Sequence, residues 1–217
     1  LTFLRFSSSI SILTFFNLQM TPIQALDANS ENSFGDFLLL RLISQIASIT
    51  LLVSWGLVSD LSTNEFSFLL LVGLNRAVYS IGESFYGEQQ KHERMGAYGI
   101  SLALKGMVSI SVMLLLLTNN STALTALMGW GLSHLVLLGF DILHTRPLLP
   151  SFRDMLPRSS IDSMLKLARK GLPLGVSALF ISIQINIPNY SLMMSEHYDE
   201  VGIFGSVSYT HLRAHET

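Results

Sequence analysis

The chain contains no cysteine, which excludes disulfide bonds and thiolate metal sites. Charge is scarce as well: Asp, Glu, Lys and Arg make up 13% of the 217 residues, whereas an ordinary soluble domain carries about 25%. The sequence also lacks a basic tract, a glycine-rich phosphate loop, a metal-ligand cluster and a nucleophile elbow. These absences argue against nucleic-acid binding, and we expect a protein that is not an enzyme and holds no cofactor.

Apolar residues dominate instead. Hydrophobic side chains make up 49% of the chain, and the mean hydropathy is +0.47. A helix needs about 20 mostly apolar residues to cross a bilayer. Segments of this kind lie at residues 3–20, 37–58, 66–85, 97–117, 123–143 and 171–194. The sequence therefore predicts an all-α fold, a polytopic transmembrane helix bundle with about six spans.

Lysine and arginine gather in two of the expected loops, at 86–96 and 144–170. The connectors at 59–65 and 118–121 contain neither residue. Lys and Arg close to the ends of membrane spans stay on the cytoplasmic side. We therefore predict that 144–170 is a cytoplasmic loop, that 25–36 and 86–96 share its side, and that the two connectors face the opposite side.

Two cations lie near the middle of expected spans, Arg76 and Lys105. A cation at mid-membrane costs roughly 2.5–3.5 kcal/mol on insertion scales, so it persists where it faces a polar cavity or a partner. Glu83 follows Arg76 by seven residues, which is about 10.5 Å along a helix and too far for a direct pair. A Glu83–Lys105 pair between helices is one alternative. Structural ion pairing or snorkelling of both cations is another.

Each expected span carries one polar stripe at helical spacing. Arg41 starts such a stripe, and Asn186 lies in another, beside Pro188, where we expect a kinked or broken helix. The stripes should converge, either in a dry bundle held by hydrogen bonds or in a water-filled cavity, and the mid-membrane cations favour the cavity. We interpret His134 as a packed hydrogen-bonding residue and Asp141 as a solvated carboxylate near a span end.

The end of the chain calls for separate treatment. Residues 206–217 resemble one reading frame of a sequencing adapter, translated by accident. We therefore expect 206–217 to be an artefactual tail outside the fold. Because residue 1 is Leu and the tail replaces natural sequence, we also expect the chain to be a fragment at both ends.

Short motifs of this chain occur in one known order and spacing. They are Asp36-Phe37-Leu38 with Arg41-Leu42-Ile43, Tyr86-Gly87 with Gln90 and Glu93-Arg94-Met95, Ser101 with Lys105-Gly106, Leu172-Pro173-Leu174-Gly175, Asn186-Ile187-Pro188-Asn189-Tyr190 and Val201-Gly202-Ile203-Phe204. Together they resemble the polysaccharide and O-antigen flippases, a family of the multidrug/oligosaccharidyl-lipid/polysaccharide exporter superfamily. One departure is Asn189, where related sequences tend to have a basic residue.

The resemblance implies a bundle of two lobes around a central cavity. Residues 1–143 would supply helices of the first lobe, and 171–205 the first helix of the second. The implied activity is transport of undecaprenyl-diphosphate-linked oligosaccharide across the bacterial cytoplasmic (inner) membrane by alternating access. Membrane lipids and polysaccharide polymerase or assembly proteins are the implied partners. Basic side chains would hold the lipid diphosphate, and the candidate cavity residues are Arg76, Lys105, Arg41, Glu83 and Asn186.

Other functions stay open. A cation-coupled drug antiporter of the same superfamily would favour acidic rather than basic cavity residues. A membrane-embedded glycan-processing enzyme would need a carboxylate or His cluster at an interface. A structural subunit of a glycan-assembly complex would need neither.

Overall fold

The fold is described from a computed structural model, which places residues 13–27, 29–59, 61–119, 121–149, 151–158 and 160–194. All regular elements in these ranges are helical. They are α2 (Met20–Leu26), α3 (Phe34–Val58), α4 (Thr63–Lys91), α5 (Met95–Thr118), α6 (Ala123–Thr145), η1 (Arg146–Leu148), η2 (Phe152–Met155) and α7 (Ile161–Met194). The predicted all-α class is confirmed.

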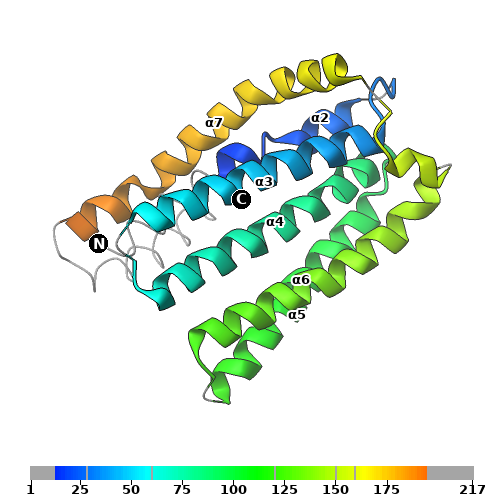
Figure 1. Cartoon of the computed structure of the whole chain (residues 1–217). Helices are drawn as coiled ribbons and strands as arrows, with labels where there is room; N and C mark the ends of the chain where they lie inside the picture. Colours follow the sequence, from blue (N-terminus) through cyan, green and yellow to red (C-terminus); the bar gives the residue numbers. More distant parts are fainter. Residues whose placement is uncertain are drawn as a thin grey trace.

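The helix α4 lies at the centre of the arrangement (Figure 1). It packs against α2 and α3 on one side and against α6 on the other, and α5 packs mainly on α6. The long helix α7 crosses the outer side of α2 and α3, away from α5 and α6 (Figure 1). The central position of α4 buries many of its polar side chains, among them Asn75, Ser80, Ser84 and Gln89.

The bundle is apolar outside and polar inside, and α5 shows this most clearly. The buried residues of α5 are Ser101, Lys105 and Ser109, which share one stripe. Its large apolar side chains point outward, among them Ile110, which is 60% exposed, and Leu115, which is 64% exposed. Water would favour the opposite distribution, whereas lipid favours this one.

Four helical stretches are long and apolar enough to cross a membrane: Phe34–Val58, Met95–Thr118, Ala123–Leu148 and Ile161–Pro188. These stretches indicate a membrane protein. The predicted count of about six spans is not confirmed. The expected span 66–85 forms the middle of α4, which has the length of a span but is too polar to qualify by composition.

The predicted loop at 86–96 is wrong in its extent. Helix α4 continues to Lys91 and α5 begins at Met95, so only three residues connect them. The stretch looked like a loop because it is polar. It stays helical because Tyr86 and Gln89 are buried at 2% and 1% exposure, and Gln89 donates to the hydroxyl of Thr145 on α6.

The sixth expected span also begins earlier than predicted. Helix α7 starts at Ile161, where the hydroxyl of Ser160 accepts a hydrogen bond from the Ser163 amide, as an N-cap does. The charged residues of its first turns suggested a loop. Leu167, which is 1% exposed, instead packs against Phe37 and anchors an amphipathic stretch. The helix continues through Pro173 and Pro188, so the expected break at Pro188 is absent.

The first expected span, 3–20, lies partly outside the described residues. Residues 13–16 are helical, and a turn at 17–19 separates them from α2. Leu18 and Gln19 in this turn have φ values of 50° and 47°. The bend thus precedes Pro22, which sits in the first turn of α2, where its missing amide hydrogen costs nothing. The predicted tail at 206–217 lies outside the described residues altogether.

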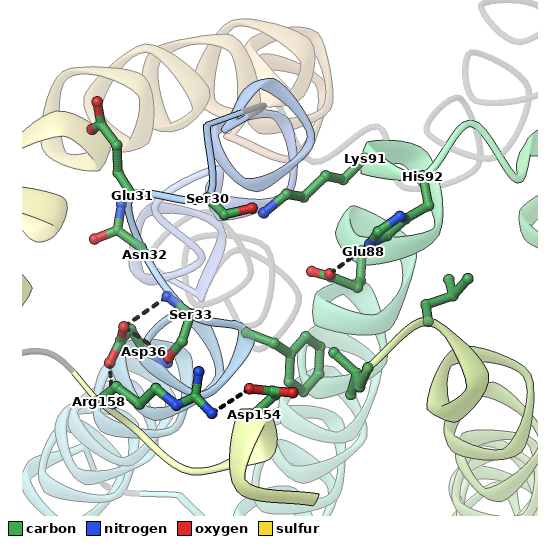
Figure 2. Close-up of a pocket in the computed structure, with 13 residues that line it drawn as sticks. Ser30, Glu31, Asn32, Ser33, Asp36, Glu88, Lys91, His92, Asp154 and Arg158 are labelled. Atoms are coloured by element: carbon green, nitrogen blue, oxygen red, sulfur yellow. Dashed lines mark hydrogen bonds and ion pairs between the residues drawn. The ribbon is translucent and has the colours of Figure 1, made fainter. Parts of the chain in front are cut away.

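Three loops meet at one end of the bundle (Figure 2). A pocket of about 380 Å³ there is lined by residues of the α2–α3 loop, of the end of α4 and of the segment between α6 and α7. Asp36 ties two of them together: its carboxylate caps α3 through Ser33 and accepts a hydrogen bond from the Arg158 amide. These three loops are expected from the sequence on one side of the membrane, and in the structure they lie at one end of the bundle.

Candidate functional site

Arg41 is the most completely buried cation of the described residues, with 0% of its surface exposed. Its Nη1 lies 2.8 Å from Oε2 of Glu83 and donates at 2.7 Å to the carbonyl of Ser80, both on α4. Its Nη2 donates to the hydroxyl of Thr21. Asn17 closes the network by donating to the same Glu83 oxygen at 2.7 Å.

This network assigns Arg41 a structural role. Its guanidinium joins α2, α3 and α4 at their common interface and has no surface left for a ligand. It also shows that the alternative Glu83–Lys105 pair was wrong, because Glu83 is bound to Arg41. Glu83 keeps a side-chain exposure of 17%, so the pair is covered but not sealed.

Lys105 forms a second buried ion pair, on the opposite side of α4. Its Nζ lies 2.8 Å from Oδ2 of Asp141 on α6, and the two side chains are 4% and 0% exposed. The interpretation of Asp141 as a solvated carboxylate was therefore wrong. The side chain lies one turn from the end of α6 but points between the helices rather than toward the end.

The surroundings of this pair are built to hold it. Ser101, one turn before Lys105, donates a hydrogen bond to the other oxygen of Asp141, Oδ1. The hydroxyls of Ser101 and Tyr86 lie 3.1 Å apart. Gly82 provides the room: a Cβ on Gly82 would lie 2.7 Å from Nζ of Lys105. Sequence spacing could have suggested Asp141, because His134 and Asp141 share a stripe of α6.

Lys105 also borders an open groove. A pocket of about 270 Å³ is lined by residues of α4, α5 and α6, namely Tyr79, Leu102, Lys105, Gly106, Ser109, Ile110, Trp130 and His134. Trp130 and His134 meet edge to face, with ring centroids 5.1 Å apart, and Tyr79 meets His134 at 5.8 Å. The groove is thus lined by three aromatic rings in successive contact and by one cation.

Arg76 also lies close to the Tyr79 ring. Its Cζ is 5.3 Å from the ring centroid, and Nζ of Lys105 is 5.5 Å from the same centroid. The two mid-span cations singled out from the sequence therefore lie near the same aromatic side chain. Among the described residues Arg76 forms no ion pair, and its side chain is partly exposed.

The remaining candidates behave differently. His134 directs Nδ1 to the carbonyl of Trp130 at 3.0 Å, which fits the expected packed hydrogen-bonding role. Asn186 donates to the carbonyl of Ser182 on its own helix, α7. Because α7 lies across α2 and α3 from α5, the structure does not bring Asn186 to Lys105 (Figure 1). The side chain of Asn189 lies outside the described residues.

The pocket at the loop end is a weaker candidate, although it is roomy (Figure 2). Its carboxylates are already engaged: Asp154 pairs with Arg158 at 2.6 Å, and Glu88 bonds to Gln24 and to His92. Within the described ranges no group of three or more His, Asp or Glu residues is placed to hold a metal ion. We therefore take the groove at Lys105 as the candidate functional site.

Comparisons of this chain with protein-family models, with curated proteins and with solved structures found no match. The flippase resemblance therefore stays a prediction, and a functional proposal has to rest on the geometry of the groove.

Proposed function

We propose that this protein is a membrane transporter of the flippase type. It moves a lipid-linked oligosaccharide with a diphosphate headgroup across the bacterial cytoplasmic membrane by alternating access. The observation that carries the proposal is the pair of cations at Tyr79: Arg76 and Lys105 both lie close to this ring, which lines a groove, within a bundle that is apolar on its outer surface. Cations at such a place attract an anion that must pass through lipid.

The size of the groove limits what it takes. Small-molecule pockets usually measure about 300–1,000 Å³, and this groove of about 270 Å³ falls just below that range. It suits a headgroup fragment such as a diphosphate, and the lipid and the remaining sugars would lie outside it. The aromatic wall at Trp130 suits the apolar face of a sugar ring next to that diphosphate.

The two cations would act differently on a diphosphate. Arg76 offers a planar fork that matches two phosphate oxygens, whereas Lys105 acts as a compact point charge. Arg41 leaves the list of binding residues, since it is fully buried and both of its terminal nitrogens are bound within the protein. Its part in transport is to hold α3 against α4 while the binding groove changes access.

One observation favours the drug-antiporter alternative, namely the buried carboxylate of Asp141 next to the groove. An antiporter would use such a carboxylate to attract a cation. Lys105 neutralises it at 2.8 Å, so this pair carries no net charge, and Arg76, which forms no ion pair among the described residues, supplies the remaining charge near Tyr79. We therefore prefer an anionic substrate.

The test uses the protein encoded by the complete gene, in cells that depend on it for surface glycan. Arg76→Ala and Lys105→Gln should abolish glycan display while the protein remains in the membrane. Lys166→Ala, which removes an exposed cation on α7, is the matched control and should display glycan normally. Normal display in both groove variants would refute the proposal, and a loss of drug resistance with intact display would favour the antiporter.

A further inference from the structure

The cation that lines the groove already has an anionic partner. Lys105 is paired with Asp141, and each side chain lies almost wholly within the protein. Any anionic headgroup that binds Lys105 must therefore compete with a carboxylate of the protein itself. We propose that Asp141 is a built-in competitor, which sets how tightly the groove holds an anion and which headgroups it accepts. This inference rests on the proposed function.

The two oxygens of Asp141 are held in unequal ways. Oδ1 accepts a hydrogen bond from Ser101, and Ser101 is in turn in contact with the hydroxyl of Tyr86. Oδ2 forms the ion pair with Lys105 and has no further hydrogen bond among the described residues. The carboxylate thus stays anchored by Oδ1 if Lys105 turns away, so an exchange of partners does not require α6 to move.

Lys105 is able to turn. Its flexible stem ends above Gly82, where only the absence of a side chain makes room for the ammonium, and beside the rings of Tyr86 at 4.5 Å and Tyr79 at 5.5 Å. Gly106, the next residue on α5, has open space around its Cα and borders the same groove. A short rotation toward the groove carries the ammonium from Asp141 along the two rings, which attract it throughout.

The competition has two effects on transport. A neutral headgroup cannot replace the charge of Asp141 beside Lys105, so the groove selects for anions. The binding free energy of an anion is only the difference between its own attraction to Lys105 and that of Asp141, and this keeps its affinity modest. A transporter needs such modest affinity, because the substrate has to leave on the opposite side of the membrane.

The experiment measures binding of inorganic pyrophosphate to the purified, detergent-solubilised protein from the complete gene, by titration calorimetry at fixed ionic strength. Asp141→Asn removes the competitor and should tighten binding by about tenfold. Gly82→Ala keeps both charges but places a methyl group 2.7 Å from the present position of Nζ, which must then shift, so this variant should also bind pyrophosphate more tightly. Lys105→Gln should abolish binding, and so should the neutral pair Lys105→Gln with Asp141→Asn, which leaves no charge unpaired.

Each outcome decides between competition and its absence. Equal affinity of wild type, Asp141→Asn and Gly82→Ala would overturn the competition. So would the absence of binding in all of them, because a freed Lys105 should bind. If Asp141→Asn fails to fold, as judged by its thermal unfolding, Gly82→Ala gives the answer alone, since it keeps the ion pair's charges. The proposed function is judged separately by glycan display with Arg76→Ala, so either idea can fail while the other stands.

Discussion

The guanidinium of Arg41 lies 2.8 Å from the carboxylate of Glu83, although 42 residues separate them in the chain. The pair fixes the distance between α3 and α4 in a region where both helices are polar. A buried pair of this kind contributes little net energy compared with apolar packing, but removing one partner leaves the other unpaired. The pair therefore determines how α3 and α4 pack against each other more than it adds to the stability of the fold.

Removing one member of the Arg41–Glu83 pair should destabilise the fold strongly. We expect Arg41→Met or Glu83→Gln to lower the free energy of unfolding by about 3–5 kcal/mol, because each leaves a buried charge alone. The double variant should recover much of the loss, and Arg169→Ala, an exposed cation on α7, should cost almost nothing. Thermal unfolding in detergent measures all four. A double variant as unstable as the sum of the singles would show that the two residues act independently.

Two glycines of α6 provide a matched comparison. A Cβ on Gly131 would collide with the side-chain oxygen of Asn75, whose amide donates to the carbonyl of Leu127 at 3.1 Å. Gly131→Ala should therefore break this link between α4 and α6 and cost about 1–3 kcal/mol. Gly139→Ala meets open space and should be neutral or slightly stabilising, by up to about 1 kcal/mol from helix propensity. Equal unfolding midpoints would mean that α4 and α6 do not pack closely at Gly131.

Much of the fold was predictable from the sequence, because apolar length and helical spacing are local properties. The buried residues of α5 are Ser101, Lys105 and Ser109, which follow one another at helical spacing in the sequence. The helix ends were less predictable. Residues 86–91 and 161–170 are polar enough to resemble loops, and their helical state depends on contacts with distant partners, such as Gln89 with Thr145.

The partners within the site were not predictable. The helical spacing of polar residues places Lys105 on the inner face of its helix, but it does not show whether the carboxylate that pairs with Lys105 is Glu83 or Asp141. That choice depends on which face of α4 turns toward α3 and which toward α6, and only the packing of three helices decides it. The assignment of Asp141 to solvent failed for this reason: depth was judged along one helix, whereas burial comes from the neighbours.

Because the chain has no cysteine, single introduced cysteines can report its surroundings. We expect Gly106→Cys, which borders the groove, to react in intact membranes with a charged, membrane-impermeant maleimide. Val136→Cys should not react, although Val136 is 73% exposed, because its face of α6 would meet lipid and a thiol there stays protonated. The measurement is the labelled fraction of each variant, with detergent-unfolded protein as the reference. Rapid labelling of Val136→Cys would mean that this face lies in water and would contradict the membrane assignment.

Asp36 has a second role besides capping α3, and a comparison with Glu65, which also caps a helix, distinguishes the two roles. Asp36 and Glu65 both complete capping boxes, with Ser33 and Ser62 respectively. Asp36 also accepts a bond from the distant Arg158 amide, which ties the segment before α7 to α3. Glu65→Gln should cost at most about 1 kcal/mol, the usual range for a helix cap. Asp36→Asn loses an acceptor at a buried position and should cost about 1–3 kcal/mol in total.

The difference should also appear locally. With Asp36→Asn, residues 151–158 should become more sensitive to limited proteolysis, because their backbone loses its anchor on α3. With Glu65→Gln they should be cut as slowly as in the wild type. Equal cleavage in the two variants would show that the segment is held by its packing over Gly35, where Leu156 lies in close contact, rather than by the carboxylate. Gly35→Ala would then be the change that releases it.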